Sequence, residues 1–267
     1  MSKIKIIISV VIYEADFYLL QRAFQSLLKA LELDMWDVEL YIRDNSTSFP
    51  EKLQEIINFY SKIIKVSYVS GGGNVGYGKG HNQCLNECCY HVILNPDLEV
   101  APDALKVAIE FMEQHPKCGL LTPFATWRDG KVQRLCKTYP TVFDLLLRGF
   151  APDFVKHIFK CRLAKYEMAN QLNEQDIYWD PPIVSGCFML FRSEVLKQIG
   201  GFDPRFFLYF EDFDISLRAA KVSRIAYVPQ VKVVHHGGHA SRKGWKHIKM
   251  FGRSMITFFN IHGWRWW

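Results

Sequence analysis

The segment richest in chemically useful side chains is residues 207–214, Phe-Leu-Tyr-Phe-Glu-Asp-Phe-Asp. Its three carboxylates, Glu211, Asp212 and Asp214, lie among aromatic side chains, where a charge is costly unless it binds a cation or exchanges a proton. A carboxylate in such surroundings can take a hydroxyl proton as a general base. The alternative is a solvated helix N-terminus, where the helix dipole favours acidic residues.

A cluster of histidines follows downstream, in the sequence His235-His236-Gly237-Gly238-His239. A lone histidine is more often structural, but three within five residues favour a site in which imidazoles complete a metal's ligand set.

The turn Asn95-Pro96-Asp97 follows an apolar run and carries a carboxylate. Such a carboxylate can hold a divalent cation between pyrophosphate oxygens, because hard cations prefer oxygen ligands. A plain Asn-Pro-Asp turn without a ligand is the alternative.

A second apolar run ends in Asp44-Asn45-Ser46, whose polar side chains can hydrogen-bond a nucleoside. An N-cap for the next helix explains the same residues equally well.

The glycine cluster at residues 71–80, Gly-Gly-Gly-Asn-Val-Gly-Tyr-Gly-Lys-Gly, fits neither of two familiar phosphate motifs. A P-loop requires Ser or Thr where Gly80 stands, and a dinucleotide fingerprint should follow the first strand. A loop whose backbone approaches a ligand closely, leading into a helix that favours phosphate, is what the cluster predicts. A simple turn is the alternative.

The first half of the chain alternates apolar runs with helical periodicity, and this predicts β-α units around a parallel sheet. Ligands of such sheets collect beyond the carboxyl ends of the strands, where the polar segments above fall. The predicted strands are 4–12, 38–42, 64–69 and 90–94, and the predicted helices are 17–32, 51–60, 81–89 and 103–114.

The second half is less regular. Residues 143–172 favour a pair of amphipathic helices in a basic setting. A strand is expected over 184–191, a helix over 193–199 and extended chain over 224–234.

Composition excludes several classes of protein. The chain has 267 residues, of which 49% are hydrophobic, so it is neither disordered nor too small for a sizeable core. No apolar run approaches the roughly 18 residues that span a bilayer, and the run from Ile6 to Tyr13 resembles a strand more than a secretory signal. Seven cysteines without a Cys-x-x-Cys pair indicate reduced thiols and a cytoplasmic protein.

The net charge of +6 is unevenly distributed. Ten Lys and Arg residues and no acidic residue follow Asp214, so the first 214 residues carry −4. A basic end on a mildly acidic body indicates a polyanionic partner, such as phosphates or anionic lipid.

Taken in order, these motifs resemble the inverting nucleotide-sugar glycosyltransferases of family 2, which have the GT-A fold. The pattern is most similar to bacterial rhamnosyltransferases of O-antigen and cell-wall polysaccharide assembly. The resemblance covers about residues 4–241 and is carried by Ile8–Ile12, Asp44–Ser46, Gly72–Gly78, Asn95–Asp97, Ser185–Met189, Gly200–Asp203 and Phe210–Asp214.

The resemblance implies roles for individual residues. Asp212 would be the catalytic base, with Glu211 beside it, and a divalent cation (Mg²⁺ or Mn²⁺) would be held by Asp97 with His235 or His236. The implied donor-binding residues are Asp44, Asn45, Asn74, Gly76, Tyr77, Gly78, Asn95 and Asp97.

Two positions depart from the family pattern. Asn95 replaces the first acid of the Asp-x-Asp element, and Tyr13-Glu14-Ala15 replaces the usual Thr-Tyr-Asn after the first strand. The first change leaves a single carboxylate for the metal, and the second changes the nucleotide contact on that side.

The implied organisation is a GT-A domain over 1–241 followed by a basic, aromatic extension over 242–267. Within the domain, residues 1–115 would bind the nucleotide sugar and residues 116–241 would carry the acceptor and the base. The implied fold class is α/β, with a mostly parallel central sheet flanked by helices.

The implied reaction is a single in-line displacement that inverts the anomeric carbon. L-rhamnose from dTDP-rhamnose is the favoured donor, with galactofuranose and N-acetylglucosamine as alternatives, and the acceptor would be a glycan or an undecaprenyl-linked sugar. The cations and tryptophans of the extension favour peripheral attachment to the inner face of the cytoplasmic membrane, while the alternative is a C-terminal helix that covers the core.

Two competing functions explain less. A nucleic-acid-binding module would use the same basic tail but leaves the acidic segment unexplained, so no nucleic-acid partner is expected. A nucleotidyltransferase would require a glycine-rich, basic signature directly after the first strand, which this sequence lacks.

Overall fold

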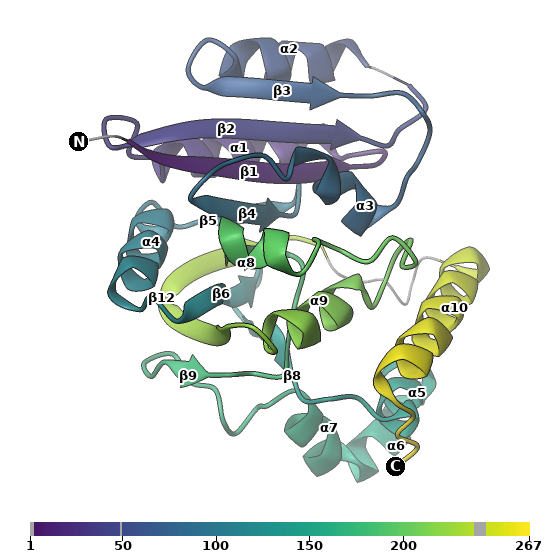
Figure 1. Cartoon of the computed structure of the whole chain (residues 1–267). Helices are drawn as coiled ribbons and strands as arrows, with labels where there is room; N and C mark the ends of the chain where they lie inside the picture. Colours follow the sequence, from purple (N-terminus) through teal and green to yellow (C-terminus); the bar gives the residue numbers. More distant parts are fainter. Residues whose placement is uncertain (1–2, 49, 238–243) are drawn as a thin grey trace.

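The computed structural model describes residues 3–48, 50–237 and 244–267. Its centre is a curled ten-stranded sheet flanked by helices, which confirms the predicted α/β class (Figure 1). The main strand order is β3-β2-β1-β4-β11-β6-β12-β5, with β7 paired to β6 and β9 paired to β12.

The N-terminal half forms the parallel part of the sheet. These strands carry apolar side chains on both faces of the sheet, as expected for strands that helices cover on both faces. The register pairs Ile12 with Asp44, so β1 and β2 end level with each other. The strands are β1 (Ile4–Ile12), β2 (Trp36–Asp44), β3 (Lys65–Val69) and β4 (Tyr90–Leu94).

The second half makes the sheet mixed. The strand β11 (Phe188–Arg192) inserts between β4 and β6 (Cys118–Trp127) and runs antiparallel to both. The long strand β12 (Arg224–His235) is parallel to β6 and antiparallel to β5 (Leu98–Val100). The remaining short strands are β7 (Val132–Gln133), β8 (Cys136–Lys137), β9 (Tyr178–Trp179) and β10 (Ile183–Val184), of which β8 and β10 form a separate pair.

Helices cover both faces of the sheet and bury two apolar clusters against it. One face packs against α1 (Phe17–Lys29), α2 (Glu51–Tyr60) and α4 (Ala104–Gln114). The other packs against α8 (Ser193–Gln198) and α9 (Glu211–Ala219). Asp44 is the last residue of β2 and Asp97 follows β4, and both strands run parallel to β1, so their carboxyl ends lie at the same edge of the sheet.

Three predicted elements were placed wrongly. The helix expected over 81–89 is α3 (Tyr77–His81) followed by a 3-10 turn (Asn82–Cys84), because Gly76 with φ 91° starts the helix inside the glycine cluster. The strand expected over 184–191 is two strands separated by residues 185–187. The expected helix pair over 143–172 is α5 (Val142–Phe150), α6 (Asp153–Ile158) and α7 (Lys160–Tyr166), with Pro152 separating the first two.

The C-terminal helix α10 (Trp245–His262) packs against the segment that carries the acids. Phe258 and Phe259 are fully buried in a cluster with Phe206 and Phe210. Ser254 Oγ also donates to the Leu208 carbonyl at 2.8 Å. The helix thus covers a part of the core, as the alternative to a free extension predicted, while Arg242 and Lys243 lie outside the described residues.

Among the described residues, no helix is both long enough and apolar enough to cross a bilayer.

We expect Phe258→Ala to lower the free energy of unfolding by about 3–5 kcal/mol, because it empties a fully buried ring site. The matched change Ile256→Ala, on the exposed side of the same helix, should cost less than about 0.5 kcal/mol. Urea unfolding of both variants measures the difference. Equal losses would show that α10 does not contribute to the core.

Candidate active site

Asp212 stands in the first turn of α9 and points at the loop before β11. Its Oδ2 accepts a hydrogen bond from the Gly186 N–H at 3.1 Å, and its Oδ1 accepts one from the Phe213 N–H at 3.0 Å. The backbone enters this helix through two left-handed residues, Tyr209 (φ 72°) and Phe210 (φ 66°). This strained entry at a sharp bend holds the carboxylate against Gly186.

Burial raises the pKa of Asp212, whereas the two amide donors and the positive charge of Lys137 act in the opposite direction. The neighbouring Glu211 is buried, and its Oε2 has no hydrogen-bond partner within the described ranges. Burial and the Asp212 charge raise the pKa of Glu211 well above its ordinary value. The pKa of Glu211 is thus raised by burial and by its charged neighbour, whereas amide donors and Lys137 oppose the rise at Asp212.

Tyr77, the first residue of α3, joins the two sides of the site. Its hydroxyl lies 2.6 Å from the Gly186 carbonyl and 3.0 Å from Asn95 Oδ1. Burial raises the pKa of Tyr77 well above 10, so the phenol remains neutral and a hydrogen-bond donor. The loop that holds Asp212 is thereby linked to the turn after β4.

Asp97 and His235 form the other side of the site. His235 Nε2 lies 3.2 Å from Asp97 Oδ1 and 3.4 Å from Asn95 Nδ2. Its second ring nitrogen meets the Gln133 amide at 2.9 Å, and the Trp127 ring stacks 5.8 Å away. A series of contacts thus runs from Asp212 through Tyr77 and Asn95 to His235 and Asp97.

The side chains here supply part of the ligand set that a divalent cation such as Mg²⁺ or Mn²⁺ requires. One carboxylate and one imidazole nitrogen converge, and a Cβ on Gly237 would come 1.7 Å from Asp97 Oδ2, so only glycine leaves the carboxylate its place. No group of three His, Cys, Asp or Glu side chains forms a metal site in the described part of the chain. The residues fit an ion that takes its other ligands from a bound diphosphate and water.

His236 turns away from this pair. Its Nε2 lies 2.6 Å from Glu99 Oε1, and the same carboxylate pairs with Arg22 at 2.7 Å. The His236 side chain therefore points away from the Asp97 and His235 side chains, although the His236 N–H donates to the Asp97 carbonyl at 2.9 Å. His239 lies outside the described residues.

Asp44 and Asn45 lie at the end of β2, buried, and their polar atoms are engaged within the protein. Asp44 Oδ2 accepts from the Tyr68 hydroxyl at 2.7 Å and Oδ1 from the Ser46 N–H at 2.8 Å. Burial and this hydrogen bond raise the pKa of Tyr68 to about 12. Asn45 Oδ1 accepts a hydrogen bond from the Val75 N–H at 3.3 Å, and Asn45 Nδ2 donates one to the Gly76 carbonyl at 3.2 Å.

Sequence reasoning missed Arg43, which organises the glycine cluster. Its buried guanidinium donates to the carbonyls of Gly71 (2.6 Å) and Gly73 (3.0 Å) and to Asn45 Oδ1 (3.1 Å). The available signal was an arginine directly after the apolar run that ends at Ile42, since a buried arginine needs partners.

The glycines at 76 and 78 serve close packing. A Cβ on Gly76 would lie 2.4 Å from the Phe207 carbonyl oxygen, and one on Gly78 would lie 2.7 Å from Phe202 Cβ. Asn74 closes the preceding turn, because its Oδ1 accepts the Gly76 N–H at 2.9 Å. These glycines therefore let α3 pack closely against Phe202 and Phe207, and this packing places Tyr77 in the site.

Lys137 was also missed. It is buried on β8, donates to the Arg134 carbonyl at 2.5 Å and lies 4.0 Å from Glu167 Oε1. Burial lowers the pKa of Lys137 to about 8. A single lysine next to Cys136 gives no periodic signal, so only the fold could place it near Asp212.

The sequence matches the family model described as glycosyl transferase family 2 over residues 7–200. That match covers more than half of the chain. The chain belongs to glycosyl transferase family 2. Glu211 and Asp212 lie beyond the matched region.

Relatives and solved structures agree with that membership. The chain of this family 2 glycosyltransferase is 28% identical to rhamnosyltransferase WbbL of Escherichia coli, over 82% of this chain and 80% of the relative. It is 25% identical to the N-acetylglucosaminyl-diphospho-decaprenol L-rhamnosyltransferase of Mycobacterium tuberculosis, over 73% and 67%. The structure of GalNAc-T7 with UDP, GalNAc and Mn²⁺ superposes with a TM-score of 0.65 at 16% identity, which shows the shared GT-A fold.

The superposition with GalNAc-T7 covers 88% of this chain and 43% of that one. The glycosyltransferase thus spans less than half of that solved chain, and most of the two bacterial relatives.

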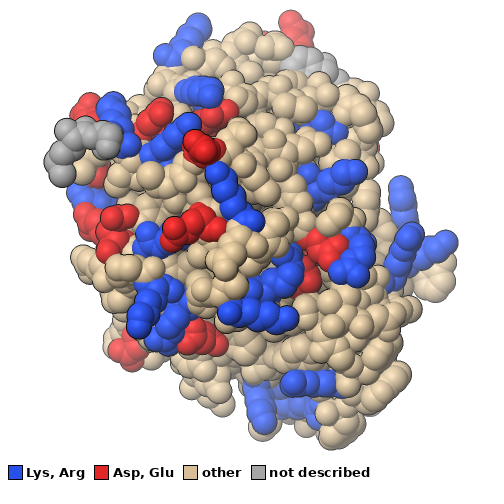
Figure 2. Space-filling model, viewed as in Figure 1, with Lys and Arg blue, Asp and Glu red and all other residues tan. Residues whose placement is uncertain are grey.

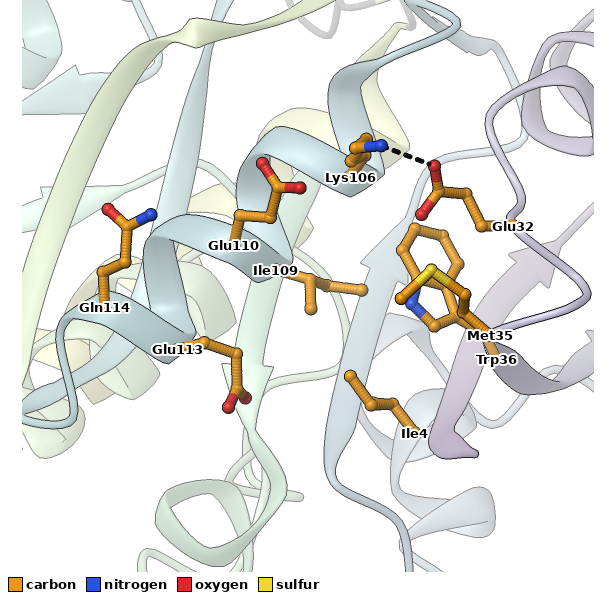
Figure 3. Close-up of a pocket in the computed structure, with 9 residues that line it drawn as sticks. All are labelled: Ile4, Glu32, Met35, Trp36, Lys106, Ile109, Glu110, Glu113 and Gln114. Carbon is orange, nitrogen blue, oxygen red and sulfur yellow. Dashed lines mark hydrogen bonds and ion pairs between the residues drawn. The ribbon is translucent and has the colours of Figure 1, made fainter. Parts of the chain in front are cut away.

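Two cavities of the glycosyltransferase lie away from this site. One, of about 260 Å³, is lined by residues of α4 and by the starts of β1 and β2, with Lys106 bonded to Glu32 at 3.0 Å (Figure 3). The other, of about 490 Å³, lies beside the starts of β6 and β12. Both are at the amino ends of their strands, opposite the edge that carries Asp97.

We expect Gly78→Ala to destabilise the glycosyltransferase by about 1–3 kcal/mol, because the added methyl overlaps Phe202. The matched control Gly149→Ala, in a helix with open space around it, should raise the free energy of unfolding by about 0.5–1 kcal/mol. Thermal unfolding measures both. If Gly78→Ala unfolded like the wild type, close packing of α3 would not be the reason for glycine at this position.

Proposed function

We propose that this glycosyltransferase inverts the anomeric carbon of a nucleotide sugar, with L-rhamnose as the favoured sugar and a glycan or lipid-linked sugar as acceptor. The observation that carries the proposal is the linked arrangement of Asp212, Tyr77, Asn95, His235 and Asp97 at the carboxyl edge of the sheet. It offers a base and a diphosphate-binding side facing each other, as a single in-line displacement requires.

Asp212 acts as the general base. Its two amide hydrogen bonds orient the carboxylate and leave lone pairs to receive the proton of the attacking hydroxyl. In this proposal Glu211 keeps its own proton, because its pKa is raised well above the ordinary value. It is then a neutral neighbour of the Asp212 carboxylate and does not compete for the proton of the attacking hydroxyl. The attacking oxygen then bonds to the anomeric carbon as the bond to the nucleoside diphosphate breaks on the opposite face.

Asp97 and His235 would hold the divalent cation, which when bound neutralises charge on the leaving diphosphate. Gln133 and Trp127 fix the His235 ring, and Asn95 connects it to Tyr77. His236 is engaged by Glu99 and takes no part in this pair.

The donor would lie along the glycine cluster. Asp44 and Asn45 shape that side through Tyr68 and Gly76, while Asn74, Gly76, Tyr77 and Gly78 line the approach to it. In this proposal residues 1–115 bind the nucleotide sugar and residues 116–241 supply the base and the acceptor side.

The sugar and the acceptor are inferred from the relatives. Both bacterial relatives are named as rhamnosyltransferases, and the mycobacterial one is named for a decaprenol-linked acceptor. This favours dTDP-rhamnose over donors of galactofuranose or N-acetylglucosamine. A lipid-linked acceptor also favours a cytoplasmic enzyme attached to the inner face of the membrane.

A panel of nucleotide sugars, assayed for transfer and hydrolysis with Mn²⁺ and with a chelator, tests the proposal. We expect dTDP-rhamnose to be the best donor. Asp212→Asn should reduce turnover by about 10²–10⁴-fold and leave nucleotide affinity unchanged, because only the proton acceptor is lost. The matched control Asp180→Asn, a surface carboxylate paired with Arg224, should behave like the wild type.

Turnover of Asp212→Asn within a few-fold of the wild type would contradict the assignment of the base. A variant that also lost nucleotide affinity would show instead that Asp212 belongs to the donor side.

We also expect turnover to fall as the pH drops through the raised pKa of Asp212, because only the ionised carboxylate accepts a proton. Lys137, with its pKa of about 8, stays charged in that range and favours the ionised form. Lys137→Met should therefore move the acid limb of the kcat profile to higher pH, by roughly one unit.

Lys106→Met, at the opposite edge of the sheet, provides the control and should leave the limb in place. An unchanged limb in Lys137→Met would mean that Lys137 does not act on the base.

A further inference from the structure

Four large apolar side chains project into solvent from α5 and α6. Leu146 and Phe150 lie one turn apart on α5, and Phe154 and Ile158 one turn apart on α6. Phe154 is 69% exposed and Ile158 is 70% exposed, the highest values among aliphatic and phenylalanine side chains in the described ranges. Single exposed apolar residues are ordinary, but four on two helices that contact each other indicate a binding surface.

The C-terminal tryptophans extend the same surface. The Val142 N–H donates to the Arg265 carbonyl at 2.8 Å, and the Phe143 N–H to the Trp266 carbonyl at 3.2 Å. Trp266 is 66% exposed and Trp267 is 72% exposed, so these contacts fix their backbone beside α5 and leave the rings outside.

The charges around this apolar patch are mainly positive. Of its acids, Asp144 is buried and bonded to Arg162 at 2.5 Å, and Glu167 pairs with Arg148 at 3.2 Å. Asp153 pairs with Lys156 at 3.8 Å.

Further cations remain available around the patch. Lys160 and Lys165 form no ion pair within the described ranges. The helix α10, which approaches α5 at its C-terminal end (Figure 1), carries Lys246, Lys249 and Arg253 on its first half and contains no acidic residue. Figure 2 shows basic side chains and uncharged surface gathered at the lower end of the molecule, where α6 and α7 lie in Figure 1.

We propose that α5, α6 and the terminal tryptophans form a membrane-binding surface that inserts into the headgroup region of an anionic lipid bilayer. Short helices with aromatic and aliphatic residues on one side and Lys and Arg around them lie in the plane of such an interface. Tryptophan prefers this depth, and each nearby cation is attracted to anionic lipid.

The distribution of charge along the sequence indicates membrane attachment through the basic extension over 242–267. The surface proposed here is a different one. Phe251, Phe258 and Phe259 of the basic C-terminal segment face the protein core, so α10 supplies cations while α5 and α6 supply the inserting side chains. The helix α10 also packs on the segment that carries Asp212. The proposed membrane-binding surface therefore has a fixed position relative to the site.

This surface gives a structural basis to the membrane attachment in the proposed function, and its test is independent of catalysis. Wild-type protein is floated with vesicles of phosphatidylethanolamine and phosphatidylglycerol at low salt, and with vesicles of phosphatidylcholine alone. We expect it to float with the anionic vesicles and to bind the neutral ones at least about tenfold more weakly.

The double variant Phe154→Ser/Ile158→Ser should lose about tenfold or more of the binding to anionic vesicles. The matched control Phe59→Ser/Ile63→Ser removes two exposed apolar side chains with the same spacing from the other end of the molecule, and should float like the wild type. Lys160→Gln/Lys165→Gln should weaken binding to anionic vesicles only.

Flotation of Phe154→Ser/Ile158→Ser at the wild-type level would overturn the proposal, as would equal loss in the control. Absence of wild-type flotation, with self-association in sedimentation that the Phe154→Ser/Ile158→Ser variant abolishes, would assign the surface to a second copy of the chain instead. Transfer to a water-soluble acceptor should be unchanged in this variant. Flotation without transfer from any nucleotide sugar would reject the proposed function and retain the surface.

Discussion

The hydroxyl of Tyr77 holds the two sides of this site together. It lies between the Gly186 carbonyl, whose own amide fixes Asp212, and the Asn95 side chain, which reaches His235. Tyr77 arrives there only because Gly76 and Gly78 let α3 approach Phe207 and Phe202 without side chains between them. Close backbone packing at Gly76 and Gly78 is therefore what places the Tyr77 hydroxyl between the two sides of the site.

The electrostatics of the site follow from unequal hydrogen bonding of adjacent acids. Asp212 has two amide donors and the field of Lys137, whereas one Glu211 oxygen is buried with no donor among the described residues. The charge of Asp212 and burial both raise the pKa of Glu211, so the two adjacent carboxylates differ in how strongly their charged forms are supported. On the opposite side, replacement of an acid by Asn95 leaves Asp97 as the one carboxylate of that turn, and the amide is used to connect Tyr77 with His235.

Local patterns predicted much of the N-terminal half. Apolar runs such as Ile4–Ile12 are covered on both faces, so their composition reports their position directly, and the polar residues after them had to meet at one edge. Long-range contacts decided the rest. The antiparallel insertion of β11, the early start of α3 at Tyr77 and the turning of His236 toward Glu99 depend on partners far along the chain. Lys137 was missed for the same reason, because only the fold places it near Asp212.

Asp214 stands two residues after the proposed base, and both of its oxygens are occupied: Oδ2 by Arg218 and Oδ1 by His262 near the end of α10. A chain shortened before Trp245 would leave a buried charge half-solvated and open an aromatic cluster to water. The terminal helix is therefore part of the support of the proposed base, and its removal would disturb the segment that carries Asp212.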